Sequence, residues 1–215
     1  MLYQLVRFLI LVVAKAYWRV TFEGLENVPA SGPFVLAPVH RSFIDFGIVS
    51  GVTRRQMGYM GKESLWTSKA LGWFITTLGA YPVNRGAPDR EALRRTLAVL
   101  EKGEPLVLFP EGTRRTGPRI DHLAEGAAFV ASRASVPVVP VGIGGSEAAL
   151  PKGKKLPRPV KIHVIVGRPL QPAPIAEGAR HPSRRAVKDL TLRLQGVLQQ
   201  LYDQAQQRAG VTVRP

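Results

Sequence analysis

Short apolar runs alternate with helical segments along the chain, and this alternation limits the fold more than any other feature. Residues 34–37, 106–109 and 136–141 are apolar at successive positions, as in strands that are buried on both faces. Helices are predicted between and after these runs, at 43–52, 64–78, 88–103, 125–134 and 183–208. The chain is therefore predicted to be an α/β protein with a mixed, mainly parallel sheet flanked by helices.

The remaining strand candidates are shorter or less apolar. Two of them lie at 59–60 and 80–83. Between residues 160 and 166, Val and Ile alternate with Lys161 and His163, which predicts a strand with one face exposed.

The chain has 215 residues and no internal repeat, so we expect one domain, at 19–215, preceded by a helix at 1–18. Because the chain has no cysteine, it can form no disulfide framework, no Cys-based zinc site and no Cys nucleophile. No His-x-x-x-His or clustered carboxylate pattern is present, so no metal site is predicted.

The amino-terminal segment, residues 1–18, is apolar but shorter than the ~20 residues that cross a bilayer. On a helix, Gln4, Arg7 and Lys15 fall within one narrow arc and leave a broad apolar face. This pattern predicts an amphipathic helix that lies on a membrane, with Tyr17 and Trp18 at the lipid–water interface. The alternative is a helix that packs on the core of the domain.

The net charge of +15 predicts attraction to an anionic partner. Nucleic acid, an anionic phospholipid membrane and phosphorylated substrates all qualify. A nucleic-acid-binding domain would use the basic clusters at 54–55, 152–155 and 184–185, but these contain no interleaved aromatic residues and match no known binding motif. We therefore expect a membrane partner and no nucleic acid.

His40 and Asp45 stand between a predicted buried strand and a predicted helix. If His40 lies in the turn and Asp45 in the first turn of the helix, the carboxylate can bind one ring nitrogen and leave the other free to accept a proton. The pair would then act as a general base, although a structural His–Asp pair at a helix start fits the spacing as well. Ser42 lacks the Gly-x-Ser-x-Gly surroundings of a nucleophile, so its hydroxyl is expected to cap the helix.

A second group of polar residues follows the strand predicted at 106–109. Glu111, Thr113 and Arg114 present a carboxylate, a hydroxyl and a guanidinium in one turn, and the guanidinium fork matches phosphate oxygens. Carboxyl ends of strands are where α/β sheets place their ligand sites. The alternative is a solvated loop whose arginines face water.

In this order, the motifs resemble those of the glycerolipid acyltransferase family, whose best-known members are the 1-acylglycerol-3-phosphate acyltransferases. The resemblance extends from about residue 25 to 167. His40 and Asp45 match the first motif, and an apolar strand that ends in an arginine, residues 79–85, matches the second. Residues 109–114, Phe-Pro-Glu-Gly-Thr-Arg, match the third motif, and 136–141, Val-Pro-Val-Val-Pro-Val, match the fourth. Val39 stands where the family often has Asn.

The resemblance implies that the domain at 19–215 is an acyltransferase. It would move a fatty acyl chain from an acyl thioester, acyl-CoA or acyl carrier protein, to the free hydroxyl of lysophosphatidate, with no other cofactor. His40 would be the general base, oriented by Asp45. The phosphate of the acceptor would be bound by Lys62, Arg85 and Arg114, and Glu111, Gly112 and Thr113 would bind or orient substrate.

The resemblance leaves several points open. Glu111 could bind glycerol hydroxyls or orient Arg114, and another membrane alcohol, a glycolipid or an ornithine lipid, could replace lysophosphatidate. The acyl chain length and the glycerol position are also open. The expected location is the cytoplasmic face of the cell membrane, as a peripheral or monotopic protein.

Overall fold

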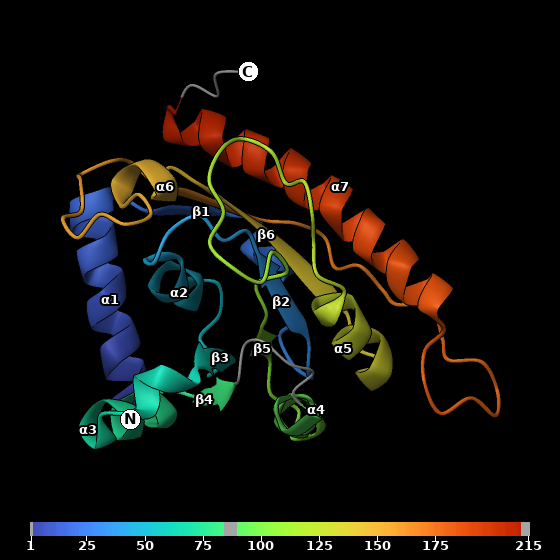
Figure 1. Cartoon of the computed structure of the whole chain (residues 1–215). Helices are drawn as coiled ribbons and strands as arrows, with labels where there is room; N and C mark the ends of the chain where they lie inside the picture. The colour runs from blue at the N-terminus through green and yellow to red at the C-terminus, as the bar shows by residue number, and fades with distance from the viewer. Residues whose placement is uncertain (1, 84–89, 212–215) are drawn as a thin grey trace.

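The computed structural model describes residues 2–83 and 90–211, which form an α/β domain built on one seven-stranded sheet (Figure 1). The strand order is β1-β7-β6-β2-β5-β3-β4. The strands are β1 Thr21–Glu23, β2 Val35–Pro38, β3 Gly58–Lys62, β4 Ala80–Val83, β5 Leu106–Val107, β6 Val138–Gly144 and β7 His163–Val166.

Neighbouring strands are parallel except for β6 and β7. The pairs β2–β6, β2–β5, β5–β3 and β3–β4 form a parallel core, and β1 and β7 run the other way at one edge. The predicted mixed, mainly parallel sheet is confirmed.

Helices cover both faces of the sheet (Figure 1). One face carries α4 Arg90–Glu101, α5 Gly126–Ala134 and α7 Arg184–Ala209, and the other carries α1 Leu2–Trp18, α2 Asp45–Ile48 and α3 Lys69–Thr77. The short helix α6 Ser146–Ala149 follows β6, and 3₁₀ turns occupy Leu25–Asn27, Val49–Gly51 and Glu63–Trp66. The helix predicted at 43–52 is thus a short α-helix followed by a 3₁₀ turn.

The long helix α7 packs closely on β6 and β7. A β-carbon on Gly142 or Gly144 of β6 would lie 2.4 Å from the Leu201 oxygen and 2.1 Å from the Ala205 carbonyl carbon, respectively. Only glycine therefore allows this approach. All of β7 is buried, so the prediction that this strand has one exposed face was wrong. The buried His163 finds polar partners in Thr21, 2.6 Å from Nδ1, and Glu23, 3.2 Å from Nε2.

Helix α1 has two apolar faces. Its inner face packs on the domain, where Tyr3 and Ala14 are buried. Of the predicted polar arc, Gln4 donates to the Arg54 carbonyl and Arg7 to the Ser50 carbonyl, whereas Lys15 is exposed. Leu, Phe and Val side chains on the outer face remain exposed. Within the described part of the chain, none of the helices combines the length and the apolar character that crossing a membrane requires.

Candidate active site

The carboxyl ends of three neighbouring parallel strands bring the predicted polar residues to one edge of the sheet. His40 follows β2, Glu111 follows β5, and Lys62 is the last residue of β3. Because β2, β5 and β3 are adjacent and parallel, the turns after them lie side by side. Arg85 follows β4 in the sequence but lies outside the described residues.

His40 and Asp45 form the predicted contact. Asp45 is the first residue of α2, and its Oδ2 lies 3.1 Å from Nδ1 of His40. The same oxygen accepts hydrogen bonds from the backbone N–H groups of Arg41 and Ser42, at 2.8 and 2.7 Å. An ionised carboxylate can only accept, so a hydrogen bond between the two groups requires Nδ1–H as the donor, and in the neutral imidazole Nε2 then holds the free lone pair.

The His40 ring is held between two aromatic side chains. Its centroid lies 4.1 Å from that of Phe109 and 5.1 Å from that of Phe46. Only 4% of the residue is exposed. The imidazole is therefore fixed in orientation by rings on two sides and by a carboxylate at one edge.

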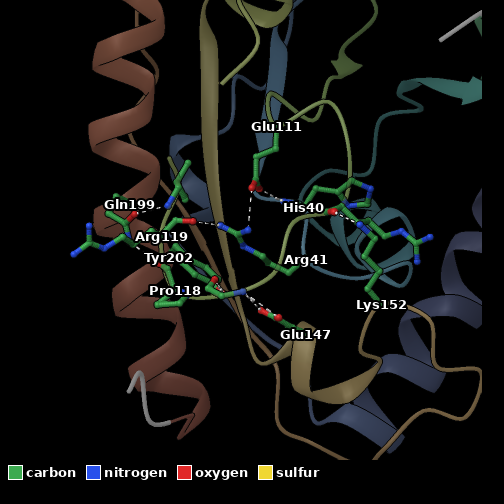
Figure 2. A network of polar contacts seen from close by, with 12 residues as sticks. His40, Arg41, Glu111, Pro118, Arg119, Glu147, Lys152, Gln199 and Tyr202 are labelled. Carbon is green, nitrogen blue, oxygen red and sulfur yellow. Dashed lines mark hydrogen bonds and ion pairs between the residues drawn. The ribbon is translucent and has the colours of Figure 1, made fainter. Parts of the chain in front are cut away.

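Arg41, which the sequence analysis did not single out, is fully buried beneath this turn (Figure 2). Its Nη1 lies 3.0 Å from Oε2 of Glu111, its Nη2 donates to the Arg119 carbonyl at 2.9 Å, and its guanidinium carbon lies 5.0 Å above the Tyr202 ring. A buried cation requires such partners, because its desolvation is costly.

Glu111 connects the turn after β5, where it lies, to the His40 turn after β2. Its Oε1 accepts the backbone N–H of His40 at 2.7 Å, and its Oε2 pairs with Arg41. Burial raises the pKa of the Glu111 carboxyl, and the Arg41 charge and the His40 amide oppose that rise. The arginine to which Glu111 is bonded is thus Arg41 and not Arg114. Glu111 therefore holds the His40 turn in place through the His40 amide and the Arg41 guanidinium.

The loop that continues from the third motif is tied to two helices (Figure 2). The Gly117 amide donates to Glu147 of α6 at 3.1 Å, and its carbonyl accepts from the Tyr202 hydroxyl of α7 at 3.4 Å. The Ile120 amide donates to Gln199 of α7 at 2.8 Å. Residues 117–120 of the loop are therefore held to both α6 and α7.

A cavity of about 520 Å³ opens beside His40. His40, Lys62, Thr113, Arg114 and Lys152 line its polar side. The rest of its wall is mainly apolar and comes from α1, α2, β3, the 3₁₀ turn Glu63–Trp66, and α3 with the residue after it. Its apolar residues include Val6, Ile10, Phe46, Met60, Leu65, Ile75 and Leu78. Its size is that of a small-molecule site, and an imidazole, several cations and an apolar wall line it.

A smaller, polar cavity of about 280 Å³ adjoins it. Thr113, Arg114 and Lys152 line both cavities, and Arg115 and Arg119 add further positive charge to the smaller one. These cations outnumber the carboxylates of Glu111 and Asp121, which also line this cavity, so it suits an anionic group. Lys152 was not predicted as a site residue, although the basic run at 152–155 was the signal for it.

The Ser42 hydroxyl donates to the Leu150 carbonyl at 2.7 Å and does not cap α2, because Ile44 occupies the cap position. Gly112 has φ +69°, which favours glycine and turns the chain between Glu111 and Thr113. Within residues 2–83 and 90–211, no three His, Asp or Glu side chains are grouped so as to hold a metal ion.

A family model and known acyltransferases match this chain. Residues 19–144 match the family model described as Acyltransferase. The chain is 31% identical over 183 residues to the 1-acyl-sn-glycerol-3-phosphate acyltransferase of Bacillus subtilis, covering 85% of this chain and 87% of that protein. It is 29% identical over 158 residues to the chloroplastic 1-acyl-sn-glycerol-3-phosphate acyltransferase LPAT1 of Arabidopsis thaliana, covering 72% of this chain but only 44% of the plant protein.

A solved structure has the same fold. The 1-acyl-sn-glycerophosphate acyltransferase of Thermotoga maritima superposes with a TM-score of 0.72, covers 94% of each chain and is 22% identical. At this identity the match supports the fold alone.

Proposed function

The chain belongs to the acyltransferase family, as the match over residues 19–144 shows, and from this premise we propose that it transfers a fatty acyl chain from an acyl thioester to the free hydroxyl of lysophosphatidate, giving phosphatidate. The observation that carries the proposal is the His40–Asp45 pair beside a cavity with an apolar wall and a cationic rim. The names of the relatives support the choice of acceptor.

In the proposed reaction His40 is the general base. With Nδ1–H bound to Asp45, Nε2 takes the proton of the acceptor hydroxyl as its oxygen attacks the thioester carbonyl. The tetrahedral intermediate then breaks its C–S bond, and the thiolate takes the proton from the imidazolium. A thiol with a pKa of about 8.5 leaves readily, so no stronger acid is required. Asp45 holds the tautomer and stabilises the imidazolium.

The cations at the cavity rim bind the phosphate in this proposal. Lys62 and Arg114 were predicted for this role, and Lys152 shares both cavities with Arg114. A phosphate held there would position the glycerol hydroxyl against His40, and such positioning supplies much of the rate enhancement. Gly112 and Thr113 shape the loop between the phosphate site and Glu111. The predicted role of Arg85 in binding the phosphate stays a prediction.

We propose that an acyl chain lies along the apolar wall of the larger cavity, because the methylene groups of the chain are removed from water there. We propose further that the protein docks through α1 on the cytoplasmic face of a membrane, where the acceptor resides, and uses no cofactor other than the acyl donor. Exposed Leu5, Leu9 and Val13 on the outer face of α1 support this docking.

A direct assay tests the proposed function. Purified protein is incubated with lysophosphatidate and acyl-CoA or acyl carrier protein, thiol release is followed with a chromogenic reagent, and products are identified by mass spectrometry. A panel with lysophosphatidylcholine, a monoglycosyl lipid and lyso-ornithine lipid compares acceptors. We expect phosphatidate and free thiol in equal amounts. Transfer only to an acceptor without phosphate would overturn the choice of lysophosphatidate.

A further inference from the structure

Helix α3 is an apolar helix that packs with one side on the Glu63–Trp66 turn and β4 and leaves its other side uncovered. Among its residues only Gly72 is buried. Trp73 is 67% exposed and Phe74 36%, and Leu71 is exposed as well. Placing large apolar side chains in water is unfavourable, and a contiguous set of them marks an interaction surface.

The helix is nevertheless held firmly in place from beneath. A β-carbon on Gly72 would lie 2.9 Å from the Trp66 ring, so the backbone of α3 rests directly on that indole. The indole N–H of Trp66 donates to the Thr76 hydroxyl at 2.8 Å. The position of α3 is therefore fixed by Trp66, while the side chains of Trp73 and Phe74 remain exposed to solvent.

The outer face of α1 continues this surface. Leu5, Phe8, Leu9, Val12 and Val13 are all exposed there. The beginning of α1 and the whole of α3 lie at the same corner of the molecule (Figure 1). The inner sides of both helices line the larger cavity, α1 through Val6 and Ile10 and α3 through Ile75. The cavity therefore opens between two helices whose outer sides are apolar.

The charges of both segments have one sign. Helices α1 and α3 contain no acidic residue: α1 carries Arg7 and Lys15, and α3 begins at the exposed Lys69. The acidic residue nearest to α3 in sequence is the exposed Glu63, in the 3₁₀ turn before this helix. Lys62, Arg114 and Lys152 add positive charge at the cavity rim. An apolar surface with Trp and Tyr residues and lysines at its border complements an anionic phospholipid surface.

We propose that α3 and the outer face of α1 form one docking surface for an anionic phospholipid bilayer, with Trp73 and Phe74 inserted among the lipid chains. The cavity then opens toward the bilayer between the two helices, so that a lipid acceptor reaches His40 without crossing water. The identity of that acceptor rests on the proposed function, but the docking itself does not.

The first test measures binding to vesicles that hold no substrate. The full-length double variant Trp73→Ser/Phe74→Ser is compared with the unmodified protein by flotation with mixed phosphatidylcholine and phosphatidylglycerol vesicles. We expect the variant to bind more than about tenfold more weakly, because it lacks two large apolar side chains that would pass from water into the lipid. The matched control is Leu192→Ser, since Leu192 is 59% exposed on α7, on the opposite face of the sheet. The control should bind as the unmodified protein does.

The second test reports insertion in the unmodified sequence. Brominated phosphatidylcholine should quench tryptophan fluorescence in the full-length protein, and Trp73→Phe should remove most of that quenching. Unchanged quenching in Trp73→Phe, or unchanged flotation of the double variant, would overturn the proposal. So would a dimer of the unmodified protein that the double variant cannot form, because the surface would then belong to a second copy of the chain.

Activity separates this proposal from the proposed function. Trp73 and Phe74 do not line the cavity, so the double variant should acylate lysophosphatidate dispersed in detergent at the unmodified rate. Loss of activity on vesicle-borne acceptor alone supports docking through α3. A protein that inserts Trp73 but acylates no lipid would contradict the proposed function and leave the docking surface in place.

Discussion

At the scale of single residues, the geometry of the His40 turn depends on a buried ion pair that sequence spacing did not reveal. The contact between His40 and Asp45 was predicted on the condition that a turn separates His40 from the first turn of the helix, and the structure meets that condition. Arg41 is adjacent to His40, but its partners Glu111 and Tyr202 come from distant parts of the chain. Only the sheet and α7 bring them together, so no local pattern could predict them.

Breaking this pair should destabilise the protein. Arg41→Met leaves the Glu111 carboxylate buried without its partner, and Glu111→Gln leaves the guanidinium uncompensated. We expect each change to lower the free energy of unfolding by about 3–5 kcal/mol, measured by urea denaturation. Glu111→Gln should also lower kcat, because the His40 amide loses a charged acceptor. Unchanged stability in both variants would show that the pair is not a structural brace.

Arg114 should determine selectivity for phosphate. The variant Arg114→Ala should lose far more activity with lysophosphatidate than with a phosphate-free acceptor such as monoacylglycerol. Arg114→Lys should restore only part of it, because an ammonium group cannot make the bidentate contact. Initial rates with both acceptors give the comparison. Equal losses would mean that Arg114 has a structural role.

At the scale of elements, strongly patterned segments were predictable and short ones were not. The helix predicted at 183–208 is Arg184–Ala209, and the strand predicted at 80–83 is confirmed. The strand Thr21–Glu23 and the helix Ser146–Ala149 were missed, because three or four residues carry no periodic signal. The burial of β7 depends on α7 packing over it, which a local alternation cannot reveal.

Helix α1 shows why one pattern can support two interpretations. Its inner face packs on the core, as the alternative interpretation predicted, and its outer face is exposed, as membrane docking requires. Deleting residues 1–18 would remove one wall of the cavity, so point substitutions make a cleaner test than truncation.

The two faces of α1 should respond differently to substitution. Leu9→Ser, on the exposed face, should weaken vesicle binding and leave the thermal midpoint unchanged. Ala14→Leu, at a buried position, should lower the free energy of unfolding by about 1–3 kcal/mol through overpacking. Flotation and thermal denaturation of both variants check this. Leu9→Ser lowering stability as much as Ala14→Leu would contradict the assignment of the faces.

The contact between α7 and the sheet should also be sensitive to an added methyl group. Gly144→Ala places a methyl group against the α7 backbone, so we expect a loss of about 1–3 kcal/mol of stability. Gly196→Ala is the matched control, because nothing lies within 4 Å of its β-carbon position on α7. That change should stabilise the protein by up to about 1 kcal/mol through helix propensity. Urea denaturation should give opposite signs for the two variants.

At the scale of the whole molecule, the parallel sheet gathers distant motifs at one edge. His40, Lys62 and the loop at 111–114 lie at the carboxyl ends of three adjacent strands, and α1 and α3 contribute to the wall of the cavity beside them. Chain order and strand character could be predicted from the sequence, but the strand order, and with it the shared cavity, could not. The cavity extends from His40, the proposed general base, to the proposed lipid surface, and the proposed chemistry requires that connection.

The most direct test of the central claim is the rate of thiol release by His40→Ala with lysophosphatidate and acyl-CoA in detergent. Far-UV circular dichroism and the thermal midpoint should stay close to those of the unmodified protein, while the rate falls by about 10²–10⁴-fold through loss of the general base. Asp45→Asn should cause a smaller but clear loss. A folded His40→Ala protein that releases thiol and forms phosphatidate near the unmodified rate would contradict the account.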